Sequence, residues 1–289
     1  MLKKLILTVV CLMFVSAIGS VARAETIIPQ SALVPSTTYY TDIIGGGIGN
    51  ILVMTGGGAT PNVGQADGRN DDGFSGPINL GFSLNFFGTS YTQFWANNNG
   101  NISFGGGISD FTPVGPTGAS QPVISPFFAD VDTRNTLSGV MRLRTDIPNQ
   151  IIVTWDQVGY FNANGDKLNS FQLVLRGPGF AVPAGEGQIG FFYKSMQWET
   201  GDASGGTGGF GGDPAAVGFG NGAGDGQVLA GSTENGISGV VNNSHIWFTL
   251  DNGVPIPVPP PTGVPEPTSL LLLGGGLSVL AGYIRRSKS

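Results

Sequence analysis

Apolar side chains alternate with polar or small ones along several stretches of this sequence, and this period of two constrains the fold more than any other feature. Leu80, Phe82, Leu84 and Phe86 share one face of an extended segment. The same alternation recurs in four consecutive stretches, residues 141–144, 151–156, 171–176 and 189–194. Because short gaps separate these stretches, we predict antiparallel strands with one face buried and the other exposed to water.

Glycine accounts for 49 of the 289 residues and clusters between stretches rich in β-branched and aromatic residues, which is typical of strands joined by turns. The Asn-Asn-Asn-Gly sequence at 97–100 predicts a tight hairpin. Further strands are predicted at residues 92–96, 101–104, 123–128, 216–220 and 246–250. We find no amphipathic helix between residues 25 and 255, so a second sheet must cover the apolar face. The predicted fold class is all-β, an antiparallel β-sandwich.

Two segments flank the predicted sandwich. Residues 25–69 form a glycine-rich N-terminal arm, in which the apolar stretch 51–54 predicts either one edge strand or a loose connection. Residues 253–263 are rich in proline, which lacks a backbone N–H. We therefore predict that this segment does not pair in a sheet and is an extended linker.

The first 24 residues have the organisation of a secretory signal peptide. Lys3 and Lys4 precede an apolar run, and Ala22 and Ala24 flank Arg23 in an A-x-A cleavage site. The sequence predicts export and a mature chain that begins at Glu25.

The C-terminal segment has the organisation of a membrane span. Residues 268–284 carry no charge and predict a single hydrophobic helix about 25 Å long, slightly short of the hydrocarbon core. Arg285, Arg286 and Lys288 follow as a stop-transfer cluster on the cytoplasmic side. An ordinary anchor and a buried core helix are the simpler interpretations.

The residues before that helix give it a more specific meaning. Val264, Pro265, Glu266 and Pro267 precede it, and the basic cluster ends it. In this order, residues 264–289 resemble the PEP-CTERM sorting signal of Gram-negative bacteria. The resemblance implies that an exosortase, a membrane transpeptidase, is a partner. It also implies that the helix holds the exported protein in the inner membrane only temporarily, before release to the outer surface or the secreted matrix.

The composition between the two signals excludes several kinds of chemistry. Residues 25–263 contain seven basic and 18 acidic residues, a net charge of −11, which disfavours nucleic acid and suits solubility or cation binding. Cys11 lies in the signal peptide, so cysteine nucleophiles, disulfides and cysteine metal sites are excluded from the mature protein. His245 is the single histidine; it leaves a Ser-His-Asp triad open, although we interpret it as a strand-edge residue.

The central part of the chain carries short segments in a specific order. They are residues 124–134, 139–144, 151–155, 158–161, 169–175, 190–198 and 216–219, preceded by 70–73, 81–88 and 98–104. In this order they resemble the nidogen-like (NIDO) domain of extracellular matrix and adhesion proteins. The resemblance implies a β-rich binding module over residues 70–252 with no known catalytic activity. The cysteines and EGF-like repeats of the animal proteins are missing from this sequence, so their partners are not expected to carry over.

Two groups of oxygen-bearing side chains are candidate calcium ligands. They are Asp67, Asn70, Asp71 and Asp72 in one loop, and Asp130 and Asp132 after a predicted strand. Calcium takes six to eight oxygen ligands, which such loops supply, although neither group has the EF-hand spacing. No cofactor is required by this interpretation. The alternatives are that Asp and Asn form turns, and that Arg134 pairs with Asp130 or Asp132.

We therefore expect a non-catalytic secreted or cell-surface protein that binds extracellular polysaccharide or a surface protein in adhesion or in a biofilm matrix. The rival hypothesis is a polysaccharide hydrolase, which needs two carboxylates in one site. Asp156, Glu199 and Asp202 lie near predicted strand ends and are the candidates for that pair. Trp155 and Trp198 are expected in the core.

Overall fold

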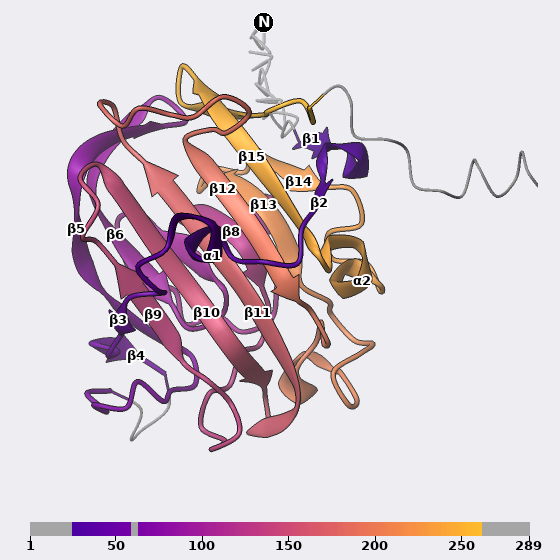
Figure 1. Ribbon diagram of the computed structural model, residues 1–289. Helices are drawn as coiled ribbons and strands as arrows, with labels where there is room; N and C mark the ends of the chain where they lie inside the picture. Colours follow the sequence, from indigo (N-terminus) through magenta and orange to yellow (C-terminus); the bar gives the residue numbers. More distant parts are fainter. Residues whose placement is uncertain (1–24, 59–62, 262–289) are drawn as a thin grey trace, which may run out of the picture.

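Two β-sheets pack face to face and enclose the hydrophobic core (Figure 1). The computed structural model describes residues 25–58 and 63–261. The predicted signal peptide, the end of the linker, the sorting motif, the 268–284 helix and the stop-transfer cluster lie outside the described residues. Within the described ranges, no helix has the length and apolar character needed to cross a membrane.

The first sheet contains the long strand β5 and seven partners. In spatial order its strands are β1 (Glu25–Ile28), β14 (Gly226–Leu229), β13 (Ala216–Asn221), β8 (Pro122–Phe128), β7 (Asn101–Ser103), β6 (Thr89–Asn97), β5 (Gly73–Phe86) and β4 (Gly56–Gly57). Along β5, Leu80, Leu84 and Phe86 are buried while Gly81, Ser83 and Asn85 are exposed, as the alternation predicts. β1 runs parallel to β14, so the prediction of a purely antiparallel fold is wrong at this edge.

The second sheet contains the four consecutive strands that the alternation predicts. Its spatial order is β16 (Val254–Pro257), β15 (Ser244–Asp251), β12 (Ile189–Ser195), β11 (Asn164–Arg176), β10 (Gln150–Tyr160), β9 (Met141–Arg144) and β3 (Asn50–Ile51), with β2 (Val34–Pro35) paired to β15. Trp155 stacks on its cross-strand neighbour Phe171, with 5.0 Å between ring centroids. Trp198 is also fully buried, so both tryptophans lie in the core as expected.

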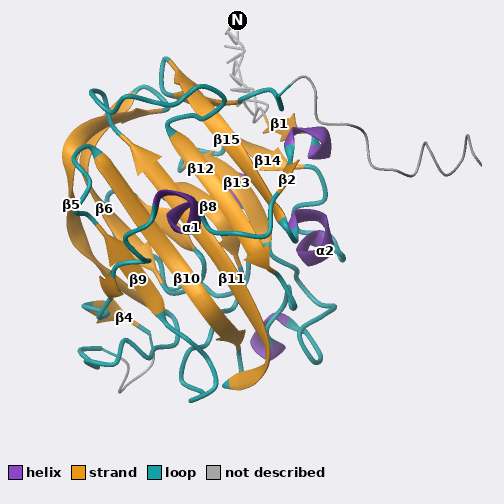
Figure 2. Cartoon of the chain, viewed as in Figure 1, coloured by secondary structure: helices purple, strands orange, loops and turns teal. Residues whose placement is uncertain are grey.

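The outer face of the second sheet is covered, which corrects the prediction that it contacts water. The N-terminal arm crosses this face and forms α1 (Tyr40–Ile44), which lies in front of the sheet in Figures 1 and 2. A second apolar cluster forms beneath it, from Tyr40, Ile152, Val174, Phe192 and Trp247. The arm therefore packs against the second sheet and pairs with it through β2 and β3. A five-residue helix carries no clear 3.6-residue period, which explains why neither α1 nor α2 (Ile237–Val241) was predicted.

The start of the proline-rich segment is a strand, contrary to prediction. β16 pairs antiparallel with β15, with Pro255 opposite Leu250 and Pro257 opposite Phe248. The N–H of Val258 then donates to the carbonyl of Trp247 at 2.8 Å. A proline can occupy an edge strand because only alternate N–H groups face the neighbouring strand. The prediction failed because it assumed that the sheet needs a backbone N–H at every position, including the positions that proline occupies.

Candidate functional site

Three chain segments meet at one end of the first sheet. Asp71 and Asp72 come directly before β5, the 98–100 turn joins β6 to β7, and Asp130 follows β8. β5, β6, β7 and β8 are neighbours in antiparallel order, so the start of β5 and the end of β8 lie at the same end. The two acidic groups, about 60 residues apart in sequence, thus lie close together in the fold. The spacing of residues within each group could not predict this.

Three carboxylates lie close enough to share a ligand. One oxygen from each of Asp71, Asp72 and Asp130 lies within 4.8 Å of the others. Asp130 is 1% exposed, and neither of its carboxylate oxygens has a hydrogen-bond partner. Gly201 packs against this carboxylate so closely that a Cβ atom there would collide with it. The site therefore contains a buried carboxyl group without a hydrogen-bond partner, and a glycine packs beside it.

Asp132 has a different role from Asp130, although the two are only two residues apart. Arg134 contacts both oxygens of Asp132, at 2.9 Å through Nε and 2.6 Å through Nη2, and its Nη2 also lies 2.9 Å from Asp71. The N–H of Ala163 donates to Asp132 as well, at 2.7 Å. The predicted alternative of an ion pair with Arg134 is thus confirmed for Asp132. No ion pair between Arg134 and Asp130 occurs among the described contacts.

The electrostatics of the site follow from burial and from mutual repulsion. Burial, and then the neighbouring charges of Asp72 and Asp71, raise the pKa of Asp130 to about 8. Burial and the charge of Asp132 raise the pKa of Asp71 to about 7, although Arg134 opposes this shift. The pKa of Asp72 is also raised, chiefly by burial, and a hydrogen bond from Asn99 opposes it. Each raised pKa means that ionising the carboxyl group in the folded protein costs free energy, and a bound cation would reduce that cost.

The other predicted ligands lie outside this cluster. Asp67 has a 62% exposed side chain and lies 3.8 Å from the Nε of Arg69. The amide oxygen of Asn70 accepts a hydrogen bond from the N–H of Gly73 at 2.6 Å, which is the turn-forming role named as the alternative. Sequence reasoning missed Asn99, which donates to Asp72 at 2.7 Å. Its only signal was a place in the predicted hairpin turn.

The three hydrolase candidates belong to three different local structures. Asp156 accepts a hydrogen bond from the Tyr39 hydroxyl at 3.0 Å. Glu199 is buried and accepts three hydrogen bonds from Gly236 and Ser238, at 2.8 to 3.0 Å, at the start of α2. Asp202 begins a short 3-10 helix. None of these contacts brings two of the three carboxylates together.

Arg176 forms a second buried charged centre, on the outer face of the second sheet. Its guanidinium is fully buried. It donates hydrogen bonds to the Gln150 side chain, the Gly187 carbonyl, the Tyr40 hydroxyl and Glu186, at 2.5 to 2.9 Å. The rings of Tyr40, Phe180 and Trp247 lie 4.3 to 5.1 Å from its central carbon. The strand alternation had placed this residue on a face expected to contact water.

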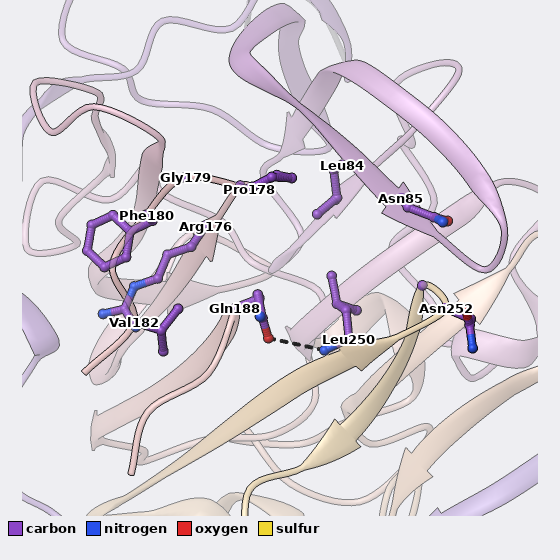
Figure 3. Close-up of a pocket in the computed structure, with 12 residues that line it drawn as sticks. Leu84, Asn85, Arg176, Pro178, Gly179, Phe180, Val182, Gln188, Leu250 and Asn252 are labelled. Carbon is purple, nitrogen blue, oxygen red and sulfur yellow. Dashed lines mark hydrogen bonds between the residues drawn. The ribbon is translucent and has the colours of Figure 1, made fainter. Parts of the chain in front are cut away.

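A cavity of about 380 Å³ opens beside Arg176 (Figure 3). Its apolar lining includes Leu84, Phe180 and Leu250, and its polar lining includes the amides of Asn85 and Asn252. Gln188 also lines the cavity, and its side-chain oxygen accepts a hydrogen bond from the N–H of Leu250 at 3.1 Å, drawn in Figure 3. The cavity thus combines apolar surface with groups that both donate and accept hydrogen bonds.

Comparison with known proteins identifies relatives of this architecture. The mouse (Mus musculus) protein alpha-tectorin is 34% identical over 178 residues, which cover 52% of this chain and 8% of alpha-tectorin. Human alpha-tectorin is 33% identical over 178 residues, and the chicken (Gallus gallus) protein is 31% identical over 180, each with the same coverage. The chain thus spans under a tenth of the length of these relatives. No solved structure matches significantly.

Two family models match the sequence itself. The PEP-CTERM protein-sorting motif matches residues 263–288, which confirms the predicted sorting signal and implies export followed by exosortase-dependent processing to the cell surface. The model described as NIDO related matches residues 53–251, which contain most of both sheets and the acidic cluster. The chain belongs to the NIDO-related family.

Proposed function

We propose that this protein is a non-catalytic binding module of the bacterial cell surface, and that it binds extracellular polysaccharide in adhesion or in a biofilm matrix. The observation that carries the proposal is the combination, in one chain, of a NIDO-related domain with a sorting motif that directs it to the surface. NIDO domains occur in matrix and adhesion proteins, which supports a binding role. A surface protein is the alternative partner.

The cavity beside Arg176 is the proposed binding site for the polysaccharide. Sugar rings present apolar faces and hydroxyl groups, and Phe180 with the amides of Asn85 and Asn252 offers the matching surface. Arg176 lies at the cavity but is already bound to Glu186 and to neighbouring acceptors. A neutral or weakly charged polysaccharide therefore suits this site better than a strongly charged one.

Binding of the purified protein to polysaccharide isolated from the producing cells tests this proposal. Phe180→Ala should weaken binding by about tenfold or more, as expected for an aromatic residue central to an interface. Phe111→Ala is the matched control, since Phe111 is also a partly exposed phenylalanine but does not line this cavity. Equal losses in both variants would reject the cavity as the site. If the protein bound neither polysaccharide nor surface proteins, the proposal that it is a binding module would be wrong.

The non-catalytic part of the proposal has its own test. Incubation with the same polysaccharide should release no new reducing ends. If the unmodified protein does release them, and Asp156→Asn or Asp202→Asn loses this turnover while keeping its fold, the protein is instead a hydrolase. Glu199→Gln is a weaker variant for this purpose, because the carboxylate of Glu199 accepts the hydrogen bonds that hold the start of α2.

A further inference from the structure

We propose that Asp71, Asp72 and Asp130 bind one calcium ion at the end of the first sheet. The cluster alone would not justify this inference. The second observation is the carboxylate of Asp130, which is 99% buried and has no hydrogen-bond partner on either oxygen, although it lies within 4.8 Å of the other two carboxylates. A buried anion without a partner is strongly disfavoured, and a cation in the cluster removes that cost.

The charges around the cluster leave room for a divalent ion. Asp71, Asp72, Asp130 and Asp132 contribute four negative charges, and Arg134 is the cation that pairs with this group among the described residues. Asp132 already has its guanidinium partner and an N–H donor. Against this one arginine the four carboxylates, when ionised, leave an excess of negative charge, and a divalent cation offsets most of it.

The donor type favours calcium. Calcium takes six to eight oxygen ligands in a flexible geometry, whereas magnesium demands near-ideal octahedral geometry and usually keeps several waters. A cluster of three carboxylates from two separate segments suits the more flexible ion. The chain has no cysteine outside residue 11, and His245 lies in β15, so nitrogen and sulfur ligands for zinc are not supplied.

The neighbouring segments are built to complete such a site. Asn98 and Thr200 are fully or nearly fully buried, and the amide of Asn98 and the hydroxyl of Thr200 have no hydrogen-bond partner. Asn98 precedes the residue that binds Asp72, and Thr200 precedes Gly201, which packs on Asp130. Both segments therefore offer further oxygen atoms at this end of the sheet, and calcium needs six to eight.

A calcium ion here would hold three segments together. The 71–72 loop, the 98–99 turn and the 130–132 segment all contribute to the site, and Val131 also pairs with Tyr160 at the end of β10 in the second sheet. The ion therefore stabilises the junction between the two sheets. This inference is independent of the proposed function, because calcium binding is measured without any polysaccharide or protein partner.

The test measures thermal unfolding of the full mature protein in CaCl₂ and in EDTA. At a calcium concentration about 100 times the Kd, the Tm should rise by about 5–10 °C. Titration calorimetry should give one calcium per chain. Asp130→Asn should abolish the calcium-dependent rise, while Asp67→Asn, an exposed carboxylate in the same loop, should retain it in full. Magnesium at the same concentration should give a clearly smaller rise.

A second variant protects the test from a failure to fold. Asp72→Asn changes a partly exposed residue, so the fold should survive, and calcium affinity should fall about tenfold or more. The same Tm for the unmodified protein in calcium and in EDTA would overturn the proposal. So would an undiminished calcium response in both Asp130→Asn and Asp72→Asn. An equal response to magnesium would overturn the choice of calcium.

Discussion

The two buried charged centres of this protein differ in how their charge is satisfied. Arg176 has four hydrogen-bond partners, an acidic neighbour in Glu186 and three aromatic rings, all from its own chain. Asp130 has the same degree of burial but no donor to either oxygen, and its nearest charged neighbours are also negative. The first centre is complete in the folded chain, whereas the second requires a cation from outside.

This difference predicts opposite responses when each charge is removed. Removing a charge that is fully paired leaves its partners buried without a counterion, which destabilises the fold. Removing a charge that is repelled by its neighbours relieves a cost, unless a bound cation already supplies the missing attraction. The variants below test both halves of this contrast, in order of expected effect.

Arg176→Met should have the largest effect. It leaves the Glu186 carboxylate, the Gln150 amide and the Gly187 carbonyl without their donor, and loss of one member of a buried pair costs roughly 3–5 kcal/mol. Urea denaturation measures this change. Lys167→Met is the control, because Lys167 pairs with the exposed Asp166 and should cost about 1 kcal/mol or less. Similar losses of stability in both variants would show that the buried Arg176 pair contributes no more than an exposed ion pair.

Tyr40→Phe should have an intermediate effect. It keeps the ring that packs against Phe192 and Trp247 but removes the hydroxyl that accepts a 2.5 Å hydrogen bond from Arg176. A hydrogen bond to a charged group contributes about 1.5–3 kcal/mol, and the free energy of unfolding should fall by that amount. Tyr91→Phe is the control, since its ring stacks on Phe104 and no hydrogen bond of its hydroxyl is described. Unchanged stability of Tyr40→Phe would show that this hydrogen bond adds nothing to the contribution of the Tyr40 ring.

Asp130→Asn should act in the opposite direction when calcium is absent. In EDTA at pH 8.5 the variant should raise the free energy of unfolding, because the neutral amide loses less on burial than the carboxylate does and is not repelled by Asp72 and Asp71. In calcium the same variant should be less stable than the unmodified protein. Asp67→Asn should change neither value, since its side chain is largely exposed. A loss of stability in EDTA would break the contrast between the two centres.

His245 should give the smallest effect, through pH. Burial lowers its pKa, a shift that the charge of Glu186 partly opposes, and its ring stacks on Phe192 at 5.0 Å between centroids. The folded state therefore binds the proton less readily than the unfolded state. The stability from neutral His245 is present above a pH of about 6.5 and is lost as the pH falls toward the lower folded pKa. His245→Phe should reduce this acid sensitivity below a pH of about 6.5, and an unchanged profile would exclude His245 as its source.

The strands could be predicted because their alternation is local. In stretches such as 80–86 and 151–156, the apolar residues themselves show which side of the strand faces the core. Arg176 shows the limit of that reasoning, since alternation gave its face correctly but not that α1 covers the face. The acidic site shows the same limit. Asp130 and Asp132 look equivalent in sequence. Only the tertiary structure shows that Asp132 pairs with Arg134 while Asp130 has no hydrogen-bond donor.

The proline strand at the margin of the second sheet has a consequence for crowding on a surface. The N–H of Val258 faces β15, so by alternation the backbone nitrogens of Pro255 and Pro257 face away from the sheet. At those positions any other residue would present an unpaired N–H donor to the strand of another molecule. Proline has no donor to offer, and the opposite margin, β3, is only two residues long. Among the described residues, the two margins of the second sheet therefore offer a neighbouring copy little template for pairing edge to edge, even where copies are crowded together.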